Sequence, residues 1–196
     1  MTHSLHRIGN VNDLKGDYIV LACLAKGINR ESPDGRQSII KIAKIFEKYE
    51  PVNLIPEYTW NISPVVTASF NDIDVVKRVI VALKKEDLGI SIVISGLISE
   101  VQKAVNEVGL KMHTVHLSLG YFGKKELLPP EEEILEITTM CGHHCISPQS
   151  VRYHLERIKN GKTTTEKAAK KLAKPCVCGI FNTERAISLL NKLLKK

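Results

Sequence analysis

The sequence predicts an α/β fold with a mostly parallel sheet and flanking helices, followed by a small helical subdomain that carries a Cys/His cluster. Two observations carry this prediction. Short apolar segments alternate with segments of helical periodicity, in the approximate order β-α-β-α-β-α-β, as far as residue 119. Beyond that point the composition changes and helix signals dominate. We therefore expect an α/β domain at 1–122 and a helical Cys/His-containing subdomain at 123–196.

Apolar runs and their punctuation define the elements of the first domain. Residues 17–25 form a nearly continuous apolar run, which is typical of a strand buried on both faces. Pro51 closes the first helix, Asn71 or Asp72 can cap the second, and Gly109 stops the third. The expected strands are 17–25, 65–70, 90–94 and 113–119. The expected helices are 39–46, 73–83 and 99–108, and 52–60 is expected to be irregular.

Capping residues define the helices of the second part. Glu131–Glu133 follow two prolines and suit the positive end of a helix that runs to about Met140. Ser147 and Pro148 are an N-cap and a first helical residue for a helix that stops at Asn160-Gly161. Thr163-x-x-Glu166 fits a capping box for a third helix, and a last apolar helix begins near residue 182.

Four of the five cysteines lie in the last 56 residues, in two breaks between predicted helices. One break reads Cys141-Gly142-His143-His144-Cys145, and the other reads Cys176-Val177-Cys178. Thiolate and imidazole are preferred zinc ligands, and cysteines also hold iron–sulfur clusters. The helices between the breaks can fold back as a hairpin and bring the two together. We predict a metal site built from Cys141, His143, Cys145, Cys176 and Cys178.

Three interpretations of this cluster stay open on sequence alone. The bound group is either zinc or an iron–sulfur cluster, because the spacing matches neither a paired CxxC ribbon nor a ferredoxin cysteine run. Alternatively, the cysteines are reduced thiols that pack a small core. A redox-active dithiol is the third interpretation, with Cys176 and Cys178 as the pair.

Composition limits the classes of protein. Hydrophobic content of 43% and charged content of 25% are ordinary globular values. No apolar run reaches the roughly 20 residues that span a bilayer, and the first residues do not resemble a secretory signal, so a cytoplasmic protein without membrane contact is expected. Dinucleotide-binding, Walker, catalytic-triad and paired-carboxylate motifs are absent.

Strand ends in a parallel sheet suggest a second candidate site. Ligands of open parallel sheets lie beyond the carboxyl ends of the strands. Lys26 and Asn29 follow the first strand, and His116 shares a strand face with Ser118. We predict that Lys26, Asn29 and His116 contact a small-molecule ligand.

These features favour a metal-binding protein of redox or cofactor metabolism, with its reaction open. The alternative is a metal- or redox-responsive regulator, because residues 131–158 resemble a helix-turn-helix DNA-binding unit with a longer turn than usual. The formal net charge is +7, and residues 152–174 are strongly basic, which permits nucleic-acid binding. A third hypothesis is an interaction module in which the basic helices bind an acidic partner.

Overall fold

The sheet is antiparallel throughout, which corrects the predicted mostly parallel sheet. The structure, a computed structural model, describes residues 7–115 and 123–196. Its sheet has the strand order β2-β3-β1-β4, and every neighbouring pair runs antiparallel. On the central strand, Val20 lies opposite Ala68 of β3 and Ile94 of β4. The strands are β1 (Tyr18–Cys23), β2 (Asn53–Leu54), β3 (Val65–Phe70) and β4 (Ser91–Ser95).

The order of elements explains why the alternation of strands and helices was misleading. Helix α2 connects β1 to β2, and helix α3 connects β3 to β4, so each helix does link two strands that run in the same direction. In each case, however, an oppositely directed strand is inserted between the two. This is the split β-α-β arrangement of β-α-β-β-α-β folds, and sequence periodicity does not distinguish it from a continuous parallel sheet.

Eight α-helices and two short 3-10 helices lie in the described ranges. All seven predicted helices are present, with Ser147 as the N-cap of α6 and Asp72 as the N-cap of α3. The third C-terminal helix is capped by Thr164 rather than by the predicted Thr163. The α-helices are α1 (Val11–Leu14), α2 (Pro33–Lys48), α3 (Ile73–Glu86), α4 (Ile98–Glu107), α5 (Glu132–Thr139), α6 (Pro148–Lys159), α7 (Thr165–Ala173) and α8 (Thr183–Leu194), and the 3-10 helices are Glu57–Thr59 and Lys125–Leu127.

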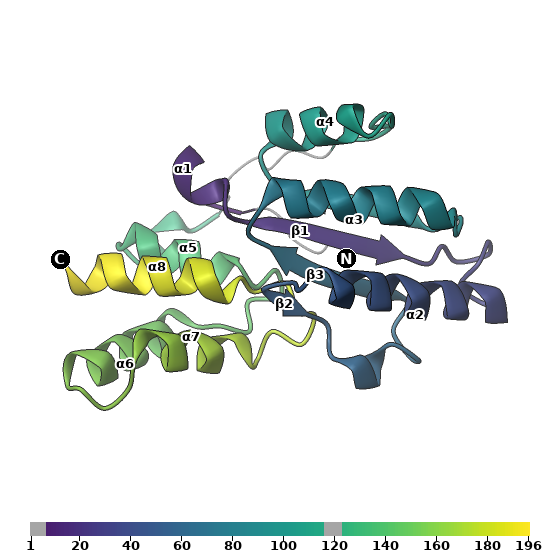
Figure 1. Cartoon of the computed structure of the whole chain (residues 1–196). Helices are drawn as coiled ribbons and strands as arrows, with labels where there is room; N and C mark the ends of the chain where they lie inside the picture. The colour runs from purple at the N-terminus through teal and green to yellow at the C-terminus, as the bar shows by residue number, and fades with distance from the viewer. Residues whose placement is uncertain (1–6, 116–122) are drawn as a thin grey trace.

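Both faces of the central strand are covered. Tyr18, Val20 and Ala22 belong to a core shared with α2, α3 and α4. Ile19 points the other way and is fully buried in a second core formed with α5–α8. In Figure 1, helices α5–α8 form one group at the left, and α2–α4 lie along the strands. This double coverage gives β1 the continuous apolar run that is usual for a parallel strand.

The helical part therefore packs onto the sheet. Ile19 of β1 lies in the core of the helical part. The division of the chain into a domain at 1–122 and a subdomain at 123–196 stays a prediction. The predicted strand at 113–119 is not seen where it is described, since 113–115 are irregular and 116–119 lie outside the described residues. In the described ranges, no helix has both the length and the apolar character needed to cross a membrane.

Candidate metal centre

The four clustered cysteines lie in two turns at the ends of a helical hairpin. The first cysteine turn, residues 140–147, connects α5 to α6, and the second cysteine turn, residues 174–182, connects α7 to α8. Helix α6 packs on α7, so the chain leaves the first turn and returns to the second. The hairpin thus brings together residues that are more than 30 positions apart in the sequence, as predicted.

Each turn is closed by a backbone hydrogen bond and contains a residue with positive φ. In the first turn, the His144 amide donates to the Cys141 carbonyl at 3.1 Å, and His144 has a φ of 55°. In the second turn, the Gly179 amide donates to the Cys176 carbonyl at 3.1 Å, and Gly179 has a φ of 66°. Both turns are therefore tight backbone bends, and each carries two of the clustered cysteines.

The side chains form a chain of close contacts. The sulfurs of Cys176 and Cys178 are 3.9 Å apart, and the Cys178 sulfur is 3.4 Å from His143 Nδ1. Cys141 lies near Cys176 and Cys145, and each of these thiols affects the pKa of its neighbour. Cys141, Cys176 and Cys178 are buried, whereas Cys145 is exposed and His143 is half-buried.

Both measured separations fit the edges of a zinc tetrahedron. Zinc–sulfur bonds of about 2.3 Å and zinc–nitrogen bonds of about 2.0–2.1 Å give sulfur–sulfur edges near ~3.8 Å and sulfur–nitrogen edges near ~3.5 Å. However, in residues 7–115 and 123–196 no group of three or more His, Cys, Asp or Glu side chains is already arranged to hold a metal ion. The pairs are therefore in place, and closure around an ion requires a side-chain adjustment.

Hydrogen bonds and burial shift the pKa values of the thiols in different directions. The hydrogen bond with Cys176, followed by burial, raises the pKa of Cys141. The hydrogen bond with Cys141 lowers the pKa of Cys176, but its contact with Cys178 and its burial outweigh this and bring it to about 11. The same Cys176–Cys178 contact lowers the pKa of Cys178, which makes Cys178 the most readily ionised thiol of the three.

The second cysteine turn is fixed to the sheet through its backbone. Thr67 of β3 donates a hydrogen bond to the Cys178 carbonyl, and Asn53 of β2 donates to the Phe181 carbonyl at 3.0 Å. Gly179 lies so close to β2 that an added Cβ would come within 2.2 Å of the Leu54 and Ile55 backbone. Only glycine fits this contact, because the approach leaves no room for a side chain.

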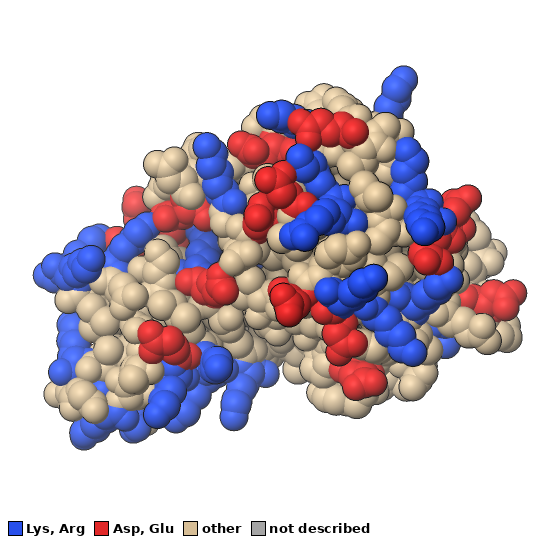
Figure 2. All heavy atoms as spheres, viewed as in Figure 1, with Lys and Arg blue, Asp and Glu red and all other residues tan. Residues whose placement is uncertain are grey.

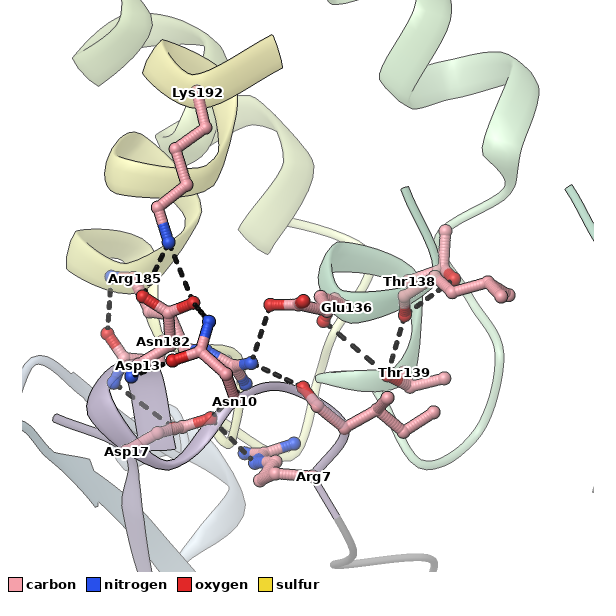
Figure 3. Close-up of polar contacts among 12 residues, drawn as sticks. Arg7, Asn10, Asp13, Asp17, Glu136, Thr138, Thr139, Asn182, Arg185 and Lys192 are labelled. Carbon is pink, nitrogen blue, oxygen red and sulfur yellow. Dashed lines mark hydrogen bonds and ion pairs between the residues drawn. The ribbon is translucent and has the colours of Figure 1, made fainter. Parts of the chain in front are cut away.

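A buried polar network lies beside the cluster and was not predicted from the sequence. Asp17, at the start of β1, pairs with Arg185 of α8 at 2.8 Å, and Arg185 also pairs with Glu136 of α5 at 3.1 Å (Figure 3). Burial, the largest effect, raises the pKa of Glu136. The sequence signal was Arg185 itself, because it shares the apolar face of the last helix with Leu189, where a charge needs a buried partner.

The structure places the three predicted small-molecule contacts differently. Lys26 is exposed, and the side chain of Asn29 bonds the backbone of Ala25 at 2.8 Å and of Gly89 at 3.3 Å. His116 lies outside the described residues. Because β1 runs opposite to β3 and β4, the carboxyl ends of these strands do not share one edge, so the reasoning behind this site no longer holds. A ligand contact at Lys26 and Asn29 stays a prediction.

A hollow of about 460 Å³ lies beside the C-terminal end of α4. It is lined by Gln102, Asn106, Lys111, Met112, His113, Thr114 and Val115. None of these is a predicted site residue, and none belongs to the two cysteine turns.

Fold and site together define an α/β protein with a split β-α-β sheet and a helical hairpin whose ends carry a cysteine cluster. No protein-family model matches this chain, and neither a curated protein nor a solved structure shows significant similarity to it.

Proposed function

We propose that this chain is a zinc-binding protein whose metal is held by Cys141, Cys176, Cys178 and His143. The observation that carries this proposal is the pair of separations of 3.9 Å and 3.4 Å, which match the edges of one zinc tetrahedron. The third buried thiol, Cys141, lies near Cys176 and would complete the donor set. Assignment to redox or cofactor metabolism stays a prediction.

The contacts between the sulfurs favour a single ion over an iron–sulfur cluster. In a cubane cluster each thiolate binds a different iron, so the sulfurs are separated by the cluster itself. Here the sulfurs of Cys176 and Cys178 are 3.9 Å apart, which is the separation expected of two thiolates that bind the same ion. Zinc at this position would join the two ends of the hairpin and thereby stabilise the fold, as closed structural zinc sites do.

Metal analysis of protein purified without oxygen tests the proposal. We expect one zinc per chain in the wild type and in the Cys23→Ser control, because Cys23 lies on β1 outside the cluster. The Cys176→Ser/Cys178→Ser variant should contain none and should unfold at a lower denaturant concentration. If the protein instead contains iron and sulfide and shows the absorbance of an iron–sulfur cluster, the bound group is a cluster and not zinc. If the wild-type protein contains no metal, the proposal is wrong.

Single substitutions in the first turn identify the fourth ligand. Cobalt in place of zinc gives absorption bands that report the number of thiolate ligands. We expect His143→Ala to weaken cobalt binding by at least about tenfold, because loss of a residue that merely orients a ligand already costs that much. Cys145→Ala should leave the spectrum unchanged. The reverse result would assign the fourth position to the exposed Cys145.

A dithiol is the second candidate function, and it is favoured by the lowered pKa of Cys178 next to Cys176. Two thiols would become one disulfide and release two protons and two electrons to an external disulfide such as oxidised glutathione. Thiol counting before and after mild oxidation, with and without added zinc, separates the two functions. Zinc should protect Cys176 and Cys178 if the metal site is the function.

A further inference from the structure

Nearly all of the net charge of this protein resides on one helical hairpin. Residues 152–174 contain eight Lys or Arg against two Glu, a balance of +6 within a chain whose total is +7. Basic side chains gather at the end of the molecule formed by α6 and α7, at the lower left of Figure 2. They are Arg152, Arg157, Lys159, Lys162, Lys167, Lys170, Lys171 and Lys174.

The lysines of α7 form a stripe that the rest of the chain does not neutralise. Lys167, Lys170, Lys171 and Lys174 have helical spacing and are exposed, opposite the buried Ala168, Ala169 and Leu172. In the described part of the chain, only Arg152 and Lys159 of the eight basic residues form ion pairs, with Glu131 and Glu156. Like charges four positions apart repel each other, so this stripe costs stability unless an anion covers it.

An aromatic platform lies on the same hairpin. Tyr153 of α6 is 58% exposed, and the Arg157 guanidinium lies 5.7 Å from its ring centroid and donates to its hydroxyl at 3.3 Å. The ring of the buried His154 lies 5.3 Å from the ring of Tyr153, centroid to centroid, and the charge of Lys171 on α7 contributes to the lowered pKa of His154. An exposed ring and a guanidinium on a hairpin that also carries a basic stripe are the components of a base-stacking surface.

We propose that the face formed by α6 and α7 binds single-stranded nucleic acid, with the α7 lysines contacting phosphates and Tyr153 stacking on an unpaired base. A stacking ring can use only bases that are not paired in a duplex. Insertion of α6 into a DNA major groove is less favoured, because residues 140–147 separate it from α5 and a helix-turn-helix unit has a turn of three or four residues. The proposal does not depend on a bound metal.

Fluorescence anisotropy with a short labelled oligonucleotide tests it, using single-stranded RNA, single-stranded DNA and the corresponding DNA duplex. We expect Lys167→Glu/Lys170→Glu/Lys171→Glu to weaken single-strand binding by more than about tenfold. The slope of the logarithm of the binding constant against the logarithm of salt concentration should become shallower by about 2, since each lost phosphate contact contributes about 0.7. The matched control, Lys44→Glu/Lys48→Glu/Lys85→Glu, reverses three exposed charges on α2 and α3 and should change binding far less. Thermal unfolding verifies that both variants are folded.

Tyr153 separates single-strand recognition from simple charge attraction. We expect Tyr153→Ala to weaken binding by between about fivefold and a hundredfold, and Tyr153→Phe to keep it, since the ring makes the contact. Preference for RNA or for DNA identifies the natural strand, and either supports the proposal. The proposal is wrong if no oligonucleotide binds, or if both triple variants lose the same affinity. It is also wrong if the duplex binds more tightly than the single strands and Tyr153→Ala does not change that affinity, or if polyglutamate at equal charge concentration displaces the oligonucleotide.

Discussion

The guanidinium of Arg7 donates a hydrogen bond of 2.5 Å to the carbonyl of Met140, the residue that precedes Cys141. The same guanidinium donates to the carbonyl of Ile180, two residues after Cys178. One side chain near the N-terminus therefore contacts the backbone of both cysteine turns. Arg7 is itself held by the buried Asp17 at 3.2 Å, so the position of the cluster depends on the polar network in Figure 3.

Arg7→Ala should destabilise the fold and weaken metal binding together. The substitution removes two hydrogen bonds and one of the two arginines that neutralise Asp17, so we expect a loss of about 2–4 kcal/mol in the free energy of unfolding. Urea unfolding with and without zinc measures both effects. The control is Arg152→Ala, because the pair of Arg152 with Glu131 is exposed and solvent screening leaves it little effect on stability. Equal small losses in both variants would contradict a role for Arg7 in holding the turns.

Gly179→Ala should be far more harmful than Gly161→Ala, although both glycines have a φ of 66°. Left-handed backbone alone costs alanine about 1–2 kcal/mol, and this applies to both sites. At Gly161 an added Cβ meets no atom within 4 Å, whereas at Gly179 it overlaps the β2 backbone. We expect about 2–5 kcal/mol at Gly179, with reduced metal content.

Chemical denaturation of the two alanine variants measures this difference directly. The loss of unfolding free energy in Gly161→Ala measures the cost of the backbone conformation alone. The additional loss in Gly179→Ala then measures the cost of displacing the second turn from the sheet. If both variants lose the same free energy, the close approach of Gly179 to Leu54 and Ile55 does not position the cysteines.

Local chemistry predicted the helices and the composition of the cluster. Ser147 accepts a hydrogen bond from the Ser150 amide, and Pro148 occupies the first turn of α6, as their residue types require. The five predicted ligands lie close together because the hairpin between Gly142 and Gly179 returns the chain to its start. Such features depend on neighbours in the sequence, which is why the sequence suffices for them.

Strand direction and the buried charges could not be predicted in the same way. β2 contains only Asn53 and Leu54, too few residues for a periodic pattern, and without it the insertion of antiparallel strands is invisible. The pairing of Asp17 with Arg185 joins positions 168 apart. Both depend on contacts that form only when the sheet and the helical part meet, and these contacts have no local sequence signature.

The stability of the α6–α7 hairpin should fall as the pH falls below about 6.5, because of His154. Burial, followed by the charges of Lys171 and Arg157, lowers the pKa of His154 below its ordinary value of 6.5. The unfolded chain therefore takes up a proton at a pH where the folded chain does not. Stability is present above pH 6.5 and is lost as the pH falls toward the lowered pKa, at up to about 1.4 kcal/mol per pH unit.

His154→Leu should remove this loss, because leucine does not titrate and the Nδ1 atom of His154 has no hydrogen-bond partner in the structure. We measure the urea concentration at the midpoint of unfolding at about pH 7.5 and at about pH 5. Between these two pH values, the midpoint of the variant should fall less than that of the wild type. His113→Leu removes an exposed imidazole outside the hairpin and serves as the control. The prediction is wrong if the wild type and the His154→Leu variant show the same pH dependence. That result would mean that His154 has the same pKa in the folded and unfolded chains, and that burial and the charges of Lys171 and Arg157 do not lower it.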